Sequence, residues 1–238
     1  MKTVIVGDIH GRTIWKDILE KEQPDRVVFL GDYVSTHDNI DSQQQIDNLM
    51  EILAAKEEKP QKFVLLRGNH DLQHLGYWWA ECSGFDRKVK EFMDDGLFYG
   101  RFLEDTQWVY VLQVGDERVV CSHAGISKVW MEQNNIHTPS DINLEPASSI
   151  FSFTPASFFD MDGNSISQPC VWIRPSALIE CAVPGYTQIV GHTPIKKLYQ
   201  HKIKDTANSI WFCDTLGLEN PAYLVIEDGV FTVRFLYE

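Results

Sequence analysis

Cysteine is scarce in this chain and is never paired at short spacing. The five cysteines are scattered, odd in number and form no C-x-x-C motif. They are Cys82, Cys121, Cys170, Cys181 and Cys213. This pattern argues against a disulfide framework and against a cysteine zinc site. We therefore expect reduced thiols and a cytoplasmic protein.

Long apolar runs are also missing. No stretch approaches the roughly 20 apolar residues that a membrane-spanning helix needs. The chain opens directly on a short β-branched run, with no basic segment and apolar segment in front of it. No internal repeat or low-complexity tract is visible. We expect no membrane association.

Positive charge is the third shortage. Against 34 acidic residues the 238-residue chain has 21 basic ones, for a net charge of −13. A protein this acidic repels polyanions, so general nucleic-acid binding is not expected. A small phosphorylated substrate is compatible with this charge if a bound metal reverses the local field. A hydrophobic content of 44% is enough for a large core.

Three strand-then-helix units occupy the first third of the chain. Short apolar runs at 3–6, 27–30 and 63–66 read as buried strands, and 41–59 has helical spacing, with Asp41 or Ser42 as its cap. Strands that alternate with helices indicate a parallel sheet with crossover helices.

Polar residues follow each of these strands. Asp8 and His10 come after the first, Asp32 after the second, and Asn69 and His70 after the third. Parallel strands end on the same edge of a sheet, and ligands in open α/β sheets bind there. We therefore expect these residues to meet in space.

The rest of the chain continues this pattern less regularly. We expect a helix at 85–95, a hairpin of 108–114 and 118–122, and a strand at 187–190. His123 and His192 again follow strands. Residues 127–184 are expected to be helices and loops over one rim of the sheet. The C-terminal runs after 195 are expected to be antiparallel strands.

Five motifs together resemble the calcineurin-like metallophosphoesterases, especially their phosphoprotein phosphatase branch. In order they are GDIHG (7–11), GD (31–32), RGNHD (67–71), SHAGI (122–126) and GHTP (191–194). The resemblance implies an α/β fold with a central β-sandwich of mixed sheets flanked by helices, in four α/β/β/α layers. It also implies one domain over 1–238, with a cap-like segment at about 127–184.

The resemblance implies a dinuclear metal centre. Asp8 and His10 would hold the first ion, Asp32 would bridge both, and Asn69, His123 and His192 would hold the second. Ligands of these types without thiolate suit Mn, Fe or Zn, and the residues alone do not choose among them. We expect Mn, with Fe or Zn as alternatives.

The chemistry implied is the attack of a metal-bridging hydroxide on phosphorus, with Asp32 and His70 as catalytic residues. His70 would protonate the leaving group, a step typically worth about 10²–10⁴-fold. Arg174, in a Trp-x-Arg context, and Asn69 would bind the substrate phosphate, and Arg67 would either bind it as well or have a structural role. Arg12, near a helix N-terminus, is a weaker candidate.

The second motif departs from the family pattern Gly-Asp-x-x-Asp-Arg-Gly. Its second Asp, which orients the acid histidine, is Ser35 here, and its phosphate-binding Arg is Thr36. Our hypothesis is that His37-Asp38 or Asp71 supplies the missing partner of His70. Two other features merit a test, namely His74 beside the third motif and the pair Trp78-Trp79 as a cleft lining, although helix packing explains the two tryptophans better.

Three functions follow from these residues. The first is a phosphatase acting on phosphomonoesters, either phosphoserine/threonine in a phosphoprotein or a phosphorylated small molecule. The alternative is a symmetrical diadenosine tetraphosphate hydrolase, which cleaves a phosphoanhydride. The third, suggested by Ser35 and Thr36, is a catalytically weakened metal-binding or interaction protein. The sequence identifies neither the physiological substrate nor the oligomeric state.

Overall fold

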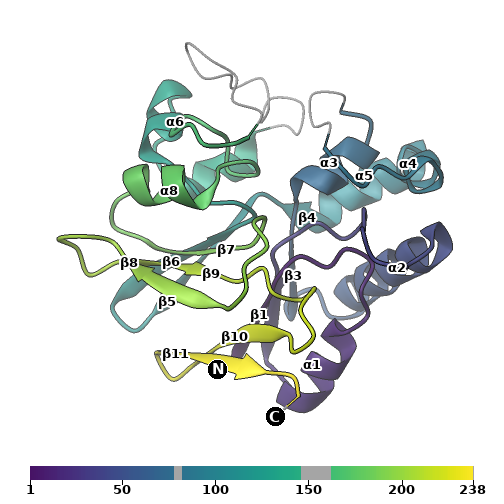
Figure 1. The fold of residues 1–238 in the computed structure, drawn as a ribbon, viewed down its shortest axis with the longest axis horizontal. Coiled ribbons are helices and arrows are strands. Elements are labelled where there is room, and N and C mark those ends of the chain that lie inside the picture. Colours follow the sequence, from purple (N-terminus) through teal and green to yellow (C-terminus); the bar gives the residue numbers. More distant parts are fainter. Residues whose placement is uncertain (78–81, 146–161, 238) are drawn as a thin grey trace.

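Two mixed β-sheets form the centre of the molecule (Figure 1). The structure is a computed structural model and describes residues 1–77, 82–145 and 162–237. In spatial order the six-stranded sheet contains β11 (Val230–Phe235), β10 (Ala222–Glu227), β1 (Thr3–Val6), β2 (Arg26–Phe29), β3 (Phe63–Leu66) and β4 (Thr106–Gln107). The five-stranded sheet contains β5 (Val109–Val114), β6 (Glu117–Ser122), β7 (Thr187–Val190), β9 (Ser209–Phe212) and β8 (Tyr199–Lys202).

Alternate side chains of the first strands point to opposite faces of the six-stranded sheet, and one of these faces packs against the other sheet. In β1, Ile5 points into the apolar layer between the sheets, whereas Val4 and Val6 point to the opposite face. β2 and β3 repeat this alternation. Both faces of these strands are buried, which explains why they appear as continuous apolar runs.

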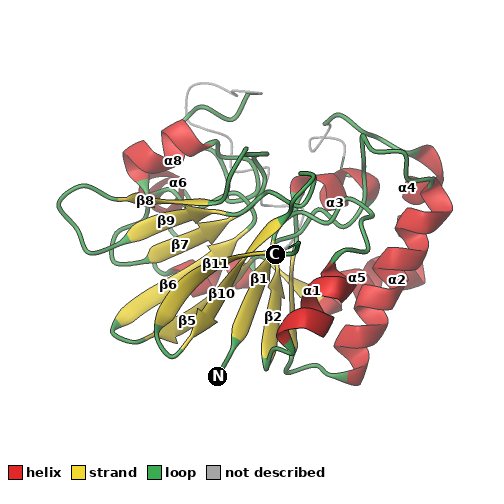
Figure 2. Cartoon of the chain, turned by 60° about the horizontal axis from the view of Figure 1, so that its bottom comes forward, coloured by secondary structure: helices red, strands yellow, loops and turns green. Residues whose placement is uncertain are grey.

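Helices cover the outer faces of the two sheets (Figure 2). The first group consists of α1 (Trp15–Glu22), α2 (Ser42–Glu58), α3 (Asn69–His74), α4 (Arg87–Met93) and α5 (Gly96–Asp105). The second consists of α6 (Lys128–Gln133), the 3-10 helix η2 (Pro139–Leu144) and α8 (Pro175–Cys181), of which α8 packs Ala177 and Leu178 against the five-stranded sheet. The predicted fold of two mixed sheets flanked by helices is confirmed.

Several local predictions are confirmed as well. β1, β2 and β3 pair in parallel. Asp41 caps α2 through a reciprocal capping box with Gln44. The turn between β5 and β6 lies at 115–116, as expected.

The C-terminal runs pair antiparallel as expected in β8–β9 and β10–β11, but they do not all lie in one antiparallel group. β9 runs parallel to β7, with Val190 opposite Phe212, and only β8 pairs antiparallel with β9. β10 joins the other sheet beside β1 and forms a hairpin with β11. The runs alternate in either arrangement, so their pattern does not reveal the sheet to which each belongs.

The segment 127–184 contains helices and loops in its described part, which comprises α6, η2 and α8. Residues 146–161, with the first half of the expected loop at 160–164, lie outside the described residues, and so do Trp78 and Trp79. No helix among the described residues is both long and apolar enough to cross a membrane.

Candidate metal centre

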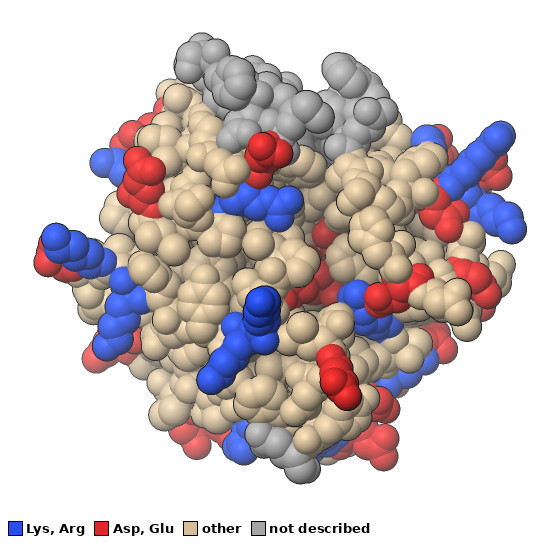
Figure 3. Space-filling view, in the orientation of Figure 1, with Lys and Arg blue, Asp and Glu red and all other residues tan. Residues whose placement is uncertain are grey.

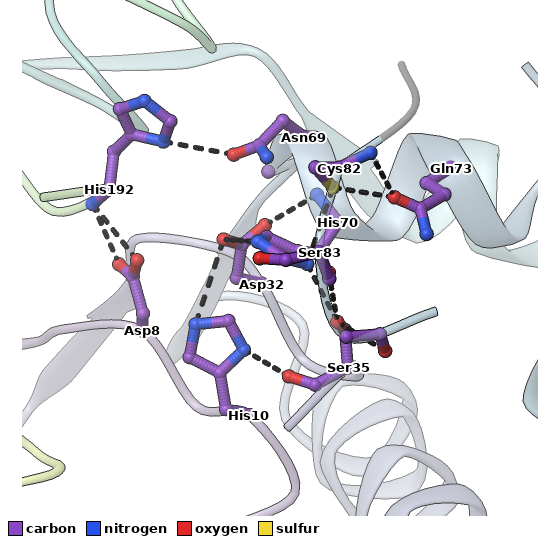
Figure 4. A network of polar contacts seen from close by, with 12 residues as sticks. Asp8, His10, Asp32, Ser35, Asn69, His70, Gln73, Cys82, Ser83 and His192 are labelled. Atoms are coloured by element: carbon purple, nitrogen blue, oxygen red, sulfur yellow. Dashed lines mark hydrogen bonds and ion pairs between the residues drawn. The ribbon is translucent and has the colours of Figure 1, made fainter. Parts of the chain in front are cut away.

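Polar side chains from five strand ends meet at one edge of the two sheets, as the topology requires. Figure 4 shows those that follow β1, β2, β3 and β7. All the side chains of the set follow the carboxyl ends of β1, β2, β3, β6 and β7, with two residues each after β1 and β3. They are Asp8, His10, Asp32, Asn69, His70, His123 and His192. The expected convergence of residues up to 184 positions apart is therefore present in the fold.

One group of candidate ligands contains Asp32, His123 and His192, whose ligand atoms lie within 4.8 Å of one another. The Nε2 atom of His123 is 3.4 Å from Oδ2 of Asp32. The Oδ1 atom of Asn69 lies 2.9 Å from this nitrogen and 2.9 Å from Nδ1 of His192. The remaining ring nitrogens of both histidines contact backbone oxygens of Leu30 and Trp172, which orients the rings.

A second group contains Asp8, His10 and Asp32, and it satisfies the same 4.8 Å limit. Nδ1 of His10 contacts the carbonyl oxygens of Val34 and Ser35, so Nε2 is left to face Oδ2 of Asp32 at 3.8 Å. Asp32 belongs to both groups, which is the arrangement that a bridging ligand requires.

Glycines make room for the two buried carboxylates. A Cβ on Gly68 would lie 2.0 Å from Oδ1 of Asp32, and a Cβ on Gly191 would lie 2.1 Å from Oδ1 of Asp8. His192 donates its backbone N–H to both oxygens of Asp8, at 3.1 and 2.9 Å. The close backbone approach explains why Gly stands directly before Asn69 and His192 in their motifs.

Strained backbone accompanies three of these residues. His10, Asp32 and His192 have φ values of +46°, +51° and +65°, a region that non-glycine residues rarely occupy. Asp71 holds the Asp32 turn in place, because its carboxylate accepts from the N–H groups of Asp32 (3.0 Å) and Tyr33 (2.8 Å). Strain of this kind persists only where the surroundings enforce it.

Burial and the charges of neighbouring side chains shift the pKa values of the cluster residues. Burial raises the pKa of Asp8 well above its ordinary value, and Asp214 raises it further. Burial also opposes ionisation of Asp32, but His123 and His70 outweigh it, so the pKa of Asp32 lies below its ordinary value. Burial lowers the pKa of His123, but Asp32 and Asp8 outweigh it and raise this pKa to about 10.

Asp214 is a member of the cluster that the motifs did not reveal. It follows β9, it is 5% exposed, and its Oδ2 atom has no hydrogen-bond partner among the described residues. An orphaned buried carboxylate oxygen beside Asp8 fits a centre that takes up cations, since such atoms are otherwise paired. The donor set of carboxylate, amide and imidazole fits them too. Polar residues after parallel strands are candidates for the site. Asp214 was not among them because β9 was expected to be antiparallel.

His70 is oriented by Ser35 itself. The Ser35 hydroxyl lies 2.8 Å from the carbonyl oxygen of Gly84, to which it donates. Its oxygen then accepts from Nδ1–H of His70 at 2.7 Å, so that Nε2 faces Oδ2 of Asp32 at 4.0 Å. Burial lowers the pKa of His70 to about 4.

The hypothesis that His37-Asp38 or Asp71 orients His70 is therefore wrong. Nε2 of His37 contacts the Ser83 hydroxyl (3.2 Å), and Asp38 pairs with Arg12 (2.8 Å). Asp71 is occupied by backbone N–H groups instead. The residue that replaces the family carboxylate takes over its contact with the histidine ring.

The cluster opens into a cavity of about 240 Å³. Its lining residues include His10, Asp32, Asn69, His70 and His192 from the cluster, and Arg12, Cys82, Trp172 and Arg174 around them. Figure 3 shows acidic side chains at the floor of a hollow in this face, with both basic and acidic side chains around it. Burial raises the pKa of the Cys82 thiol, which disfavours a reactive thiolate.

The predicted phosphate-binding arginines have different surroundings. Arg174 is anchored by contacts from Nη1 to the Thr193 hydroxyl (3.2 Å) and the His192 carbonyl oxygen (3.4 Å), at the cavity wall. Arg67 is 8% exposed, donates to the Thr106 hydroxyl (2.7 Å) and carbonyl oxygen (2.6 Å), and stacks on Trp108. Arg67 does not line the cavity, and its Nε and Nη2 donors are used inside the protein, so of its two expected roles we propose the structural one.

The remaining histidine near the third motif is structural. His74 is buried, its Nδ1 contacts the His70 carbonyl oxygen at 2.8 Å, and its Nε2 accepts from the Asp86 N–H at 3.0 Å. It does not line the cavity.

Comparison with known proteins identifies the class to which this fold and site belong. The family model described as calcineurin-like phosphoesterase matches residues 1–195. The chain therefore belongs to the calcineurin-like phosphoesterase family, and it is a metal-dependent hydrolase of phosphoric esters.

Solved structures show the same fold at low sequence identity. A mutant of a cold-active protein tyrosine phosphatase is 15% identical with a TM-score of 0.61, covering 99% of this chain and 80% of its own. A Saccharomyces cerevisiae serine/threonine phosphatase, described as similar to human phosphatase PP5, is 12% identical with a TM-score of 0.56, covering 99% and 79%. At these identities the likeness shows the fold alone.

Proposed function

We propose that this protein is a phosphatase with two metal ions that hydrolyses phosphomonoesters, either phosphoserine/threonine or a phosphorylated small molecule. The observation that carries the proposal is the pair of three-residue ligand groups that share Asp32. Asn69 adds an amide oxygen to the second group. Mn is the metal we propose for both positions, with Fe or Zn as alternatives.

The ligands serve the chemistry of the bound ions. A cation pair supplies positive charge that lowers the pKa of water and offsets the charge on phosphoryl oxygens. Asp8 and His10 would hold one ion, His123 and His192 the other, and Asp32 both. The low exposure of Asp8 and Asp32, 0% and 1%, excludes bulk water from the anionic side of the centre.

Arg174 and Asn69 would position the phosphoryl group. Arg174 uses Nη1 for the anchor on Thr193 and His192 and Nε for the Asp162 carbonyl oxygen, which leaves Nη2 for a substrate at the cavity wall. A guanidinium matches two phosphoryl oxygens at once. Arg12 also lines this cavity and is held in place by Asp38. Arg174 and Arg12 would therefore supply the positive charge that the family's arginine, replaced here by Thr36, would otherwise provide.

His70 would act on the leaving group. Ser35 fixes the ring so that Nε2, rather than Nδ1, faces the centre. In its doubly protonated form the ring would give the Nε2 proton to the leaving oxygen, and the neutral ring that remains would keep Nδ1–H on Ser35.

One observation favours the alternative, cleavage of a phosphoanhydride such as diadenosine tetraphosphate. A serine hydroxyl stabilises a protonated imidazole less than the family's carboxylate does. When an anhydride is cleaved, the leaving group is a phosphate. A phosphate is a weaker base than the alkoxide of serine, so its departure depends less on protonation by an acid. The cavity residues are compatible with both functions, and we keep cleavage of an anhydride as the second candidate.

The test combines metal analysis with rates on three substrates. Purified protein is analysed for bound metals, stripped, and reloaded with Mn, Zn, Fe or Mg before assay on a phosphoserine peptide, p-nitrophenyl phosphate and diadenosine tetraphosphate. We expect two metals per chain, with hydrolysis restored best by Mn. Asp32→Asn should abolish both metal binding and hydrolysis. Full activity of the stripped enzyme would overturn the proposal, and a preference for the dinucleotide would select the alternative.

A further inference from the structure

Asp214 is a buried carboxylate that none of the family's five motifs contains. It stands in Cys213-Asp214-Thr215, immediately after β9, and its side chain is almost fully buried. Its backbone oxygen accepts from the Ile195 N–H at 3.1 Å, but Oδ2 has no hydrogen-bond partner among the described residues. A desolvated, unpaired carboxylate oxygen is costly, so its retention needs a partner or a function.

The topology brings Asp214 to the metal centre. Because β9 is parallel to β7, Asp214 leaves its sheet on the edge where His192 leaves β7. The chain at this point packs directly on Gly7, where an added Cβ would lie 2.6 Å from the Cys213 oxygen and 3.3 Å from Cα of Asp214. Asp214 therefore lies against the residue that precedes Asp8.

The charges around Asp214 locate it on the side of the first ion. Among charged neighbours Asp214 has the largest effect on Asp8, and His10 has the largest effect on Asp214. Asp8, Asp32 and Asp214 are thus three buried carboxylates in one cluster. Their mutual repulsion in a medium of low dielectric constant is relieved by a cation among them.

We propose that Asp214 is a positioning residue of the metal centre, a third carboxylate that lies beside the cation site formed by Asp8, His10 and Asp32. It is not one of the three residues whose ligand atoms lie within 4.8 Å of one another. Asp214 would not touch the cation itself. Its negative charge would attract the cation, and its Oδ2 atom would accept a hydrogen bond from a water molecule bound to the cation. The inference rests on the proposed dinuclear centre and adds a residue to it.

The test is a calorimetric titration of Mn²⁺ into the metal-free full-length protein. Wild type should show two sites. In Asp214→Asn, which keeps the shape and removes the charge, one site should weaken about 10–100-fold, the usual cost of losing a second-sphere partner. The other site, with His123 and His192, should change by less than about threefold. Asp116→Asn, in the exposed β5–β6 turn, removes the same charge far from the cluster and should leave both sites unchanged.

Circular dichroism is used to check that each variant is folded. A second variant, Asp214→Ser, with a smaller neutral side chain, is titrated in the same way and should show the same loss of affinity. Unchanged affinity at both sites in the folded variants would overturn the inference, and so would equal weakening of both sites. Because the readout is metal affinity, its failure is distinguishable from that of the proposed function. Two sites with no hydrolysis of phosphate esters would overturn the function and leave the role of Asp214 intact.

Discussion

The Ser35 hydroxyl lies 2.7 Å from Nδ1 of His70, in the position where the family pattern has a carboxylate. Ser35 is buried and adopts a φ of +69°, and a Cβ on Gly84 would lie 2.5 Å from its Oγ. The hydroxyl is therefore held between the Gly84 backbone and the histidine ring. The substitution keeps the orientation of His70 and removes a negative charge.

Removing this hydroxyl should impair catalysis according to the leaving group. Without its partner the His70 ring loses its fixed orientation, so Ser35→Ala should lower kcat most for alkyl phosphates, up to about 10²-fold. For p-nitrophenyl phosphate, whose leaving group needs little protonation, the loss should be much smaller. The measurement is kcat over a series of phosphate esters of increasing leaving-group pKa. An equal loss across the series would contradict the role of Ser35.

Arg174 should affect substrate and phosphate binding. Arg174→Ala should raise KM and the inhibition constant of inorganic phosphate by about tenfold or more, since a charge-assisted contact contributes about 1.5–3 kcal/mol. Arg174→Lys should recover only part of this, because lysine lacks the planar fork. Inhibition constants of phosphate, measured at fixed metal, give the result. An unchanged constant in the alanine variant would remove Arg174 from the site.

Arg67 should affect stability instead. Its guanidinium donates inside the protein to Thr106 and lies 4.5 Å from the Trp108 ring centre. Arg67→Met should lower the free energy of unfolding by about 2–4 kcal/mol, because buried carbonyl groups lose a charged donor. KM should stay the same. Denaturant unfolding and steady-state kinetics on one preparation separate the two effects, and a raised KM at unchanged stability would restore a substrate role.

The glycines that face the carboxylates should be indispensable for metal binding. An added Cβ would collide with Asp32 in Gly68→Ala and with Asp8 in Gly191→Ala, at 2.0 and 2.1 Å. Each variant should lose at least one bound metal per chain by elemental analysis. Gly100→Ala is the matched control, because nothing lies within 4 Å of its Cβ position in α5. It should retain both metals and gain up to about 1 kcal/mol of stability.

Metal affinity should rise with pH through the neutral range. The pKa of His123 in the metal-free protein is raised to about 10, so its imidazole carries a proton that a cation must displace. The raised pKa of Asp8 acts in the same direction. Each displaced proton strengthens apparent affinity about tenfold per pH unit below the pKa of the group. Titrations of Mn²⁺ between pH 6 and 8 measure this slope, and a pH-independent constant would contradict it.

The edge at which the site forms follows from the sequence because parallel strands impose it. Asp8, Asp32 and Asn69 each follow a buried apolar run, and such runs, joined by helices, admit only one arrangement of their carboxyl ends. The ligand candidates were therefore predictable without coordinates.

Contacts made by short turns were not predictable. Ser35 orients His70 through a φ of +69° and a bond to Gly84, 49 residues away, and no local pattern encodes that pairing. Asp214 was missed because the alternation of β9 does not distinguish a parallel neighbour from an antiparallel one. The motif position of Arg67, two residues before Asn69, left both a substrate role and a structural role open, and only the structure shows that its side chain turns toward Thr106.

The most direct measurement of the central claim is a crystal structure of the protein soaked in Mn²⁺, with anomalous data collected at the manganese edge. The account predicts two anomalous peaks on either side of the Asp32 carboxylate, roughly 3.5–4 Å apart. One peak should contact Asp8 and His10, and the other Asn69, His123 and His192. A single peak, or peaks away from Asp32, would contradict it.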